Sequence, residues 1–288
     1  MAKYTAADIK ALRDKTGAGM MDVKKAFDEA DGDAAKAEEI LRVAGIKSAA
    51  KREGRTAANG LVAAQVVDTE NGQRGIMVEV NAETDFVAKT DRFVALGADV
   101  LRAAVESGVS DVDALLEVEQ DGRTMATRIK EEIGVIHENI HVSHLAIIEG
   151  EHVDVYLHKS DPDLPPQVGV LVATNAAGAG VAHDVAVHIA AMSPDYLAIE
   201  DVPAEVRERE ERIVTETTRA EGKPEKIIPK IVAGRMESFY KEVVLLEQGT
   251  ARDPKVQMKQ FLKENDAVVT GFARIRVGEG AEAEADAE

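Results

Sequence analysis

The sequence predicts an α+β protein, and three features of its 288 residues lead to that prediction. Helix patterns punctuated by glycine extend to about residue 45, and runs of β-type residues recur from Leu61 onward. A highly charged helical stretch then interrupts the second half of the chain. Because 45% of the residues are hydrophobic, the chain is able to bury a sizeable core.

Three short helices are expected at the N-terminus. Thr5 and Asp8 match a capping box for the first helix, and Gly17 is placed to end it. After a second helix, a third begins near Asp33 and ends at Gly45, which fits a left-handed C-cap. So small a bundle is more typical of a docking module than of an enzyme.

The predicted core begins with a β-hairpin, because two β-type runs flank Asn71-Gly72. Thr84 and Thr90 are successive N-cap signals, and the second opens a long helix. Two weaker helices follow, and Gly134 closes the later one.

Three strand-like runs come next, with the sequences ENIHVSHLAII, HVDVYLH and QVGVLVAT. Their separators, Glu149-Gly150 and the segment DPDLPP, predict that these strands form a meander. Two helices, over VAHDVAVHIAAM and from Asp253-Pro254, and a final strand over AVVTGFARIRV complete the predicted core.

A helical hairpin is predicted inside this second half. Asp201 and Pro203 begin a charged helix, and a second helix follows a turn that ends at Pro224. Pro229 either delays the start of the second helix or kinks it. Both helices carry narrow apolar stripes, so we expect an antiparallel pair that projects from the core as a structural arm or a protein contact.

These patterns divide the chain into successive parts. They are a three-helix docking domain over residues 1–46, a basic linker over 47–60, a first core subdomain over 61–139, a second core subdomain over 140–200 and 242–277, a helical arm over 201–241 and an acidic tail over 278–288. The tail is low in complexity, and we expect it to be disordered.

Charge and composition exclude several classes of function. With 53 acidic and 35 basic residues the net charge is −18, which argues against binding to nucleic acid. We find neither an apolar run long enough to span a membrane nor a signal peptide, so we expect a cytoplasmic protein without membrane contact. The chain has no Cys, which removes thiolate nucleophiles and Cys-ligated zinc. Aromatic residues make up only 3%, so an exposed aromatic would stand out.

One motif matches a catalytic pattern. His137, Glu138 and His141 fit the H-E-x-x-H arrangement of zinc hydrolases, in which both histidines share a helix face and the glutamate is the base. The run IHVSHLAII is β-branched and alternating, which favours a strand. In a strand the histidines would lie about 13 Å apart at ~3.3 Å per residue, too far to share a metal ion. We therefore favour strand histidines and keep a zinc hydrolase as the alternative function.

The remaining candidates are contact surfaces, because nucleophile elbows and phosphate-binding loops are missing from the sequence. We accordingly expect no enzymatic activity, no cofactor and no metal. Met20 and Met21 offer a soft surface, although two methionines on a small helix more often fill its core. Phe86 lies at the start of a short helix, where the pattern alone favours a side chain packed on its own helix.

Longer motifs resemble a known family. The segments LRDKTGAGMMDVKKAFDEADGD, AAKREGRTAANG and above all EVNAETDFVAKTDRF are similar to those of the bacterial translation elongation factor Ts family. The order of elements also resembles that family, through the final VTGFARIRVGEG. Val23 and Phe27 stand where the family often has Cys and Leu, and the acidic tail replaces a helical module that some relatives have there.

This resemblance implies a fold and a function. The fold would contain a ubiquitin-associated-like three-helix domain, two α+β subdomains with antiparallel sheets, and a protruding helical arm. The function would be to bind the GTPase elongation factor Tu in its GDP form and to accelerate GDP release by perturbing the magnesium and phosphate site. Self-association through the arm is a further candidate contact.

The resemblance also implies which residues touch that partner. They are Arg13, Met20, Met21, Thr84, Asp85, Phe86, Val87, Ala88, Ile133, Gly134 and His158. Asp85 and Phe86 would contact the partner's nucleotide-binding domain, with Phe86 wedged between two of its helices. Ile133-Gly134 would make a second contact with that domain, and His158 a contact from the second subdomain. Arg13 and the two methionines would belong to the docking surface of the N-terminal domain.

Overall fold

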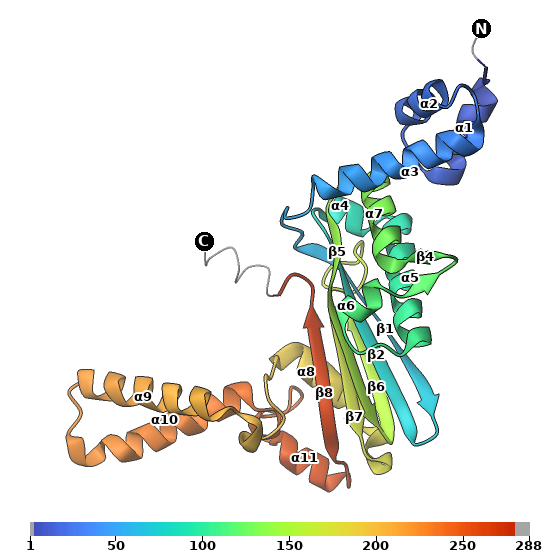
Figure 1. The fold of residues 1–288 in the computed structure, drawn as a ribbon. Helices are drawn as coiled ribbons and strands as arrows, with labels where there is room; N and C mark the ends of the chain where they lie inside the picture. The colour runs from blue at the N-terminus through green and yellow to red at the C-terminus, as the bar shows by residue number, and fades with distance from the viewer. Residues whose placement is uncertain (1–2, 280–288) are drawn as a thin grey trace.

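Two antiparallel β-sheets form the centre of the protein and helices surround them, so the predicted α+β class is confirmed (Figure 1). The structure is a computed structural model, and it describes residues 3–279. The first sheet has the order β1-β2-β5 and the second the order β6-β7-β8, while β3 and β4 form a small separate ribbon. The strands are β1 (Asn59–Thr69), β2 (Gly72–Ala82), β3 (Glu119–Gln120), β4 (Arg123–Thr124), β5 (Ile140–Gly150), β6 (His152–His158), β7 (Val168–Thr174) and β8 (Val269–Arg276).

The helices lie outside the two sheets and at the N-terminus. The α-helices are α1 (Ala6–Thr16), α2 (Met20–Glu29), α3 (Ala34–Ala50), α4 (Asp85–Ala88), α5 (Asp91–Ser107), α6 (Val112–Leu116), α7 (Met125–Ile136), α8 (Ala182–Met192), α9 (Ala204–Ala220), α10 (Ile228–Val243) and α11 (Met258–Glu264). Short 3₁₀ turns are η1 (Ala176–Gly180), η2 (Ile199–Asp201), η3 (Glu225–Ile227) and η4 (Leu245–Glu247).

The apolar faces of the two sheets pack on each other. Val62 and Met77 of the first sheet belong to one buried cluster with Leu171 and Ile275 of the second. The sheets approach closely because Gly169 has no side chain: a Cβ atom there would lie 2.5 Å from the sulfur of Met77. Helices α5 and α7 cover the outer face of the first sheet, and α8 and α11 that of the second. The core is therefore a helix–sheet–sheet–helix stack.

The predicted meander of three strands is wrong. β5 pairs with β2, from Gln73 opposite Gly150 to Ala82 opposite Ile140, whereas β6 pairs with β7. Glu149 and Gly150 are the last residues of β5, and the bend at Glu151 carries the chain from the first sheet to β6 in the second. The predicted division of the core at residue 140 separates β5 from the strand with which it pairs.

The N-terminal unit has the three expected helices, and the Thr5–Asp8 capping box and the left-handed Gly17 are confirmed. The predicted helix ends at Gly45 and Gly134 are wrong, because α3 and α7 both continue past their glycine. The two glycines face each other where these helices cross: a Cβ atom at Gly134 would lie 2.4 Å from the Cα atom of Gly45. Both glycines therefore serve close helix packing, and α7 instead ends at His137, whose φ is 66°.

The helical hairpin is present as α9 and α10, which project sideways from the second sheet (Figure 1). Pro203 immediately precedes α9, and Pro229 lies in the first turn of α10, where a proline causes no kink. Helix α11 starts later than the predicted Asp253-Pro254, because residues 250–257 form a loop closed by the bridge between Gly249 and Gln257. The predicted disorder of the acidic tail concerns residues 280–288, which lie outside the described part of the chain.

A buried histidine lies where the hairpin joins the core. His188 of α8 is 2% exposed, and its Nδ1 atom accepts a hydrogen bond of 3.1 Å from the backbone N–H of Ala251. Its Nε2 atom therefore donates to Oε1 of Gln248, at 2.9 Å, and Gln248 in turn donates to the backbone oxygen of Glu242 at the end of α10. This network is complete only with a neutral imidazole, and burial lowers the pKa of His188.

We expect this histidine to make the protein less stable in mild acid. Because the folded-state pKa lies below the unfolded value, the unfolded chain binds the proton first as the pH falls. Stability contributed by the neutral ring is complete above the unfolded pKa of about 6.5, and is lost below it at up to ~1.4 kcal/mol per pH unit. Urea unfolding at about pH 7.5 and about pH 5.5 checks this, with His188→Gln as the comparison. An unchanged pH dependence in the variant would contradict the assignment.

Candidate functional site

The short helix α4 presents an aromatic side chain to solvent. Thr84 caps the helix by accepting a hydrogen bond of 3.3 Å from the N–H of Val87. Ala88 is 1% exposed and faces the core, whereas Phe86 is 69% exposed. The pattern-based expectation of a self-packed Phe is therefore wrong, because Ala88 supplies the buried face of so short a helix. Among the large hydrophobic side chains exposed within residues 3–279, Phe86 is the aromatic one.

A cation accompanies this exposed ring. The ammonium group of Lys89 lies 4.8 Å from the centroid of the Phe86 ring, within the range of a cation–π contact. Asp85 is exposed beside it. The tip of α4 thus combines an apolar face with charges of both signs, an arrangement suited to another protein's surface.

The platform beneath α4 is built from the ends of three strands. Ala82, the last residue of β2, lies opposite Asn59 of β1 and Ile140 of β5. Glu83 follows directly: its carboxylate accepts a 2.6 Å hydrogen bond from the N–H of Asn139, and its backbone oxygen accepts one of 2.9 Å from the Asn59 amide. Because these bonds join segments from distant parts of the sequence, α4 is attached to the sheet on both sides.

The H-E-x-x-H motif belongs to this platform and does not form the helix turn that a shared zinc ion would need. His137 is the left-handed cap of α7, and His141 is the second residue of β5. The Glu138 carboxylate instead accepts hydrogen bonds from the backbone N–H and hydroxyl of Thr84, at 2.9 and 2.7 Å. Within residues 3–279 no cluster of three or more potential ligands is arranged to hold a metal ion.

His158 lies at the same end of the core as α4. It is the exposed last residue of β6, and its Nδ1 atom is 3.0 Å from the hydroxyl of Tyr156. Gln167 connects it to the first sheet, because the backbone N–H of Gln167 donates to the oxygen of His158 and its side chain donates to that of Gly60. Asp85, Phe86 and His158 thus share one end of the stacked sheets.

Ile133 and Gly134 pack against other parts of the protein. Ile133 is 5% exposed and belongs to the core of the first sheet, and Gly134 is covered by Gly45. The exposed residue of α7 next to α4 is its cap, His137.

The N-terminal candidates are all exposed. Met20 and Met21 are 61% and 74% exposed at the start of α2, so the expectation that such methionines fill the core is wrong. The core of this unit is made instead by residues such as Leu12, Val23 and Phe27. Arg13 is also exposed.

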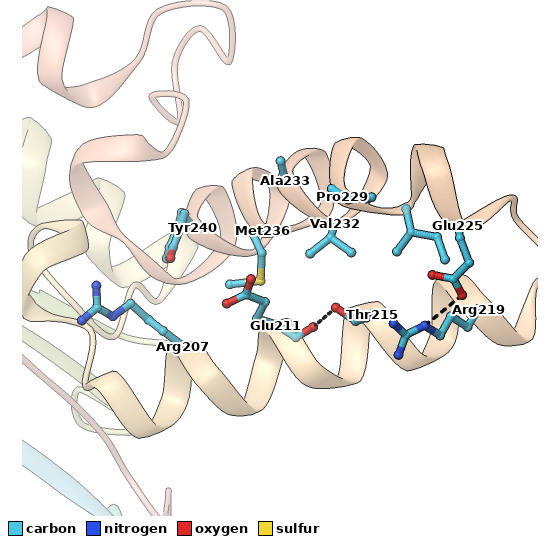
Figure 2. Close-up of a pocket in the computed structure, with 11 residues that line it drawn as sticks. Arg207, Glu211, Thr215, Arg219, Glu225, Pro229, Val232, Ala233, Met236 and Tyr240 are labelled. Carbon is cyan, nitrogen blue, oxygen red and sulfur yellow. Dashed lines mark hydrogen bonds and ion pairs between the residues drawn. The ribbon is translucent and has the colours of Figure 1, made fainter.

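The arm carries a groove of about 480 Å³ between its two helices (Figure 2). One wall is the polar face of α9, and the other is a mainly apolar face of α10. The residues that line it are Arg207, Glu211, Thr215, Arg219, Glu225, Ile228, Pro229, Val232, Ala233, Met236 and Tyr240. Self-association through the arm stays a prediction, which sedimentation of the purified protein would test.

The arrangement as a whole presents an exposed aromatic side chain on a hydrogen-bonded platform, which is the kind of surface that protein-binding proteins carry. The family model described as elongation factor TS matches residues 83–279. Elongation factor Ts of Micrococcus luteus is 60% identical over 281 residues, and that of Kocuria rhizophila 57% over 279, each match covering 96% of this chain and the whole relative. Elongation factor Ts of Bifidobacterium longum subsp. infantis is 50% identical over 282 residues, covering 98% of this chain and the whole relative.

This chain therefore belongs to the elongation factor Ts family. Family membership places it in translation elongation, a stage of protein biosynthesis. In the part of the chain that the structure describes, none of the helices has the length and apolarity needed to cross a membrane.

Proposed function

We propose that this protein binds elongation factor Tu in its GDP form in the cytoplasm and accelerates GDP release. The observation that carries the proposal is Phe86, 69% exposed on a helix held to three strand ends. Exposing a Phe to water is unfavourable, so burial of the ring against a docked partner would contribute free energy to the complex. The family relationship supports elongation factor Tu as that partner.

The proposed exchange step uses the end of the core that carries α4. Phe86 inserts between helices of the partner's nucleotide-binding domain, and Asp85 contacts the same domain. This insertion perturbs the groups that hold the magnesium ion and the phosphates, so GDP leaves. Because coupling between two ligands is reciprocal, GDP bound to the partner weakens the complex by the same factor by which the complex weakens the binding of GDP.

Several contacts must share the effect. Burying one Phe contributes ~2–3 kcal/mol, which is at most about a hundredfold in an equilibrium. His158 lies at the same end of the core as Phe86, and we propose it as a second contact. Since Ile133 is buried and Gly134 faces Gly45 of α3, we propose that the contact from α7 is made by the exposed His137 at its end.

The N-terminal unit is proposed to be a ubiquitin-associated-like docking domain. Its exposed Met20 and Met21 form a flexible apolar surface, and Arg13 adds a cation. Docking by this unit would raise the effective concentration of α4 near the partner, because both belong to one chain.

The test is release of fluorescent GDP from elongation factor Tu. We expect addition of this protein in stoichiometric amounts to accelerate release, and added excess magnesium to reduce the acceleration. An unchanged release rate would contradict the proposed function. Matched amounts of an unrelated acidic protein control for nonspecific effects of charge.

A further inference from the structure

Glu138 is the glutamate of the H-E-x-x-H motif, and neither a metal site nor the proposed partner contacts explain it. Its carboxylate makes two hydrogen bonds to one residue 54 positions away: Oε2 accepts from the N–H of Thr84 at 2.9 Å, and Oε1 from the hydroxyl of Thr84 at 2.7 Å. Thr84 is the cap of the helix that carries Phe86. Two hydrogen bonds between the same two residues fix the position of Thr84 relative to Glu138 in a way that one bond would not.

We propose that Glu138 is a positioning residue for nucleotide exchange, which orients Phe86 through the Thr84 cap. The proposal rests on the proposed function and deepens it. Glu138 sets the direction of the cap, because the hydroxyl of Thr84 donates its hydrogen to Glu138 and turns a lone pair toward the N–H of Val87.

Helix α4 depends on this outside support. It has only four residues, Asp85–Ala88, and so short a helix is unstable in isolation. Its buried side chain is Ala88, which contributes little apolar area, and Val87 is only partly buried. Hydrogen bonds therefore decide the orientation of α4 to a greater degree than packing does.

Glu138 itself is firmly held. The next residue, Asn139, donates its N–H to Glu83 at 2.6 Å and its side-chain amide to the oxygen of Arg55 at 2.7 Å. Ile140 then enters β5 and is 2% exposed. The carboxylate thus projects from a point fixed by the sheet, which is what a positioning residue requires.

Two substitutions of Glu138 distinguish a role in positioning Thr84 from a direct effect of the Glu138 charge on the partner. In Glu138→Gln the amide oxygen can accept from the N–H of Thr84 while the NH₂ group donates to its hydroxyl oxygen, so the geometry survives without the charge. In Glu138→Ala both bonds are lost. A residue that acts by its charge would fail in both variants, whereas a positioning residue is rescued by Gln.

The experiment measures fluorescent GDP release from elongation factor Tu at increasing concentrations of each full-length variant. We expect Glu138→Ala to lower the maximal release rate about tenfold, with a smaller change in the half-saturating concentration, and Glu138→Gln to stay within about twofold of the wild type. Amide hydrogen exchange at Thr84 and Val87 should accelerate in the Ala variant and not in the Gln variant. Glu149→Ala, which removes an exposed carboxylate on β5, the strand that follows Glu138, is the control and should leave the rate unchanged.

Phe86→Ala provides the reference that separates the two proposals. If Glu138 acts through Phe86, adding Glu138→Ala to Phe86→Ala should lower the rate by less than about twofold more. No acceleration of release by the wild-type protein would overturn the proposed function, whereas a wild-type rate in Phe86→Ala would remove α4 from the exchange site. A slow Phe86→Ala with a fast Glu138→Ala would overturn only the positioning role, as would equal losses in the Ala and Gln variants.

A second variant covers the case in which Glu138→Ala does not fold. Thr84→Val keeps the shape of Thr84 and its N–H but removes the hydroxyl that Glu138 holds. We expect a loss of maximal rate of about five- to tenfold. A wild-type rate in this variant would overturn the positioning role.

Discussion

Replacing Phe86 by Ala should slow stimulated GDP release by about ten- to a hundredfold while leaving the protein folded. The ring is 69% exposed, so its removal takes little buried area from the free protein. In the complex the same ring would be buried, and its loss would cost ~2–3 kcal/mol. Stopped-flow measurement of fluorescent GDP release, together with a thermal melt of the free variant, checks both parts of this prediction.

Ile213→Ala is a matched control, because Ile213 is also an exposed apolar side chain, at 48%, but lies on the arm. Its release rate should equal that of the wild type. If Phe86→Ala abolished release while binding stayed intact, Phe86 alone would carry the exchange and the distributed set of contacts would be wrong. A wild-type rate would instead remove α4 from the site.

Replacing Gly134 by Val should detach the N-terminal helical unit from the core. A Cβ atom at Gly134 would lie 2.4 Å from the Cα atom of Gly45, so backbone has to move. Such overpacking costs ~1–3 kcal/mol or more, whereas replacing a helical glycine gains less than ~1 kcal/mol in helix propensity, so the clash prevails. The unit keeps its own core around Phe27, so we expect it to separate rather than to unfold.

Limited proteolysis and solution scattering measure this separation. The segment between α3 and β1 should be cut about tenfold faster, and the radius of gyration should increase. Gly234→Val is the control, because a Cβ atom at Gly234 on α10 would have no other atom within 4 Å. If the protease cut this segment in Gly134→Val no faster than in the wild type, the crossing of α3 and α7 would tolerate a side chain and the prediction would be wrong.

Local signals in the sequence were sufficient for much of the fold. The caps at Thr5, Thr84 and Thr90 are confirmed, because a cap depends on residues within one helical turn. The hairpin of β1 and β2 is confirmed for the same reason. Gly45 was misinterpreted because a helix-ending glycine and a glycine at a helix crossing look alike until the second helix is in place.

In the candidate site, too, some features follow from neighbouring residues and others only from tertiary contacts. The segment from Thr84 to Ala88 was identified from its sequence, but the exposure of Phe86 depends on which residue of α4 faces the sheet. The bond between Glu138 and Thr84 spans 54 residues and could not be read from either segment alone. The burial of Ile133 likewise depends on the sheet against which α7 packs.

The sequence by itself determined the α+β class, the family resemblance, the N-caps at Thr5, Thr84 and Thr90 and the first β-hairpin, since each depends on residues that are neighbours along the chain. The tertiary structure decided that β5 joins the first sheet, that Gly45 and Gly134 form a crossing, and that Phe86 points outward. Pairing and burial are properties of segments that meet only in the folded state, where side chains compete for the same buried space.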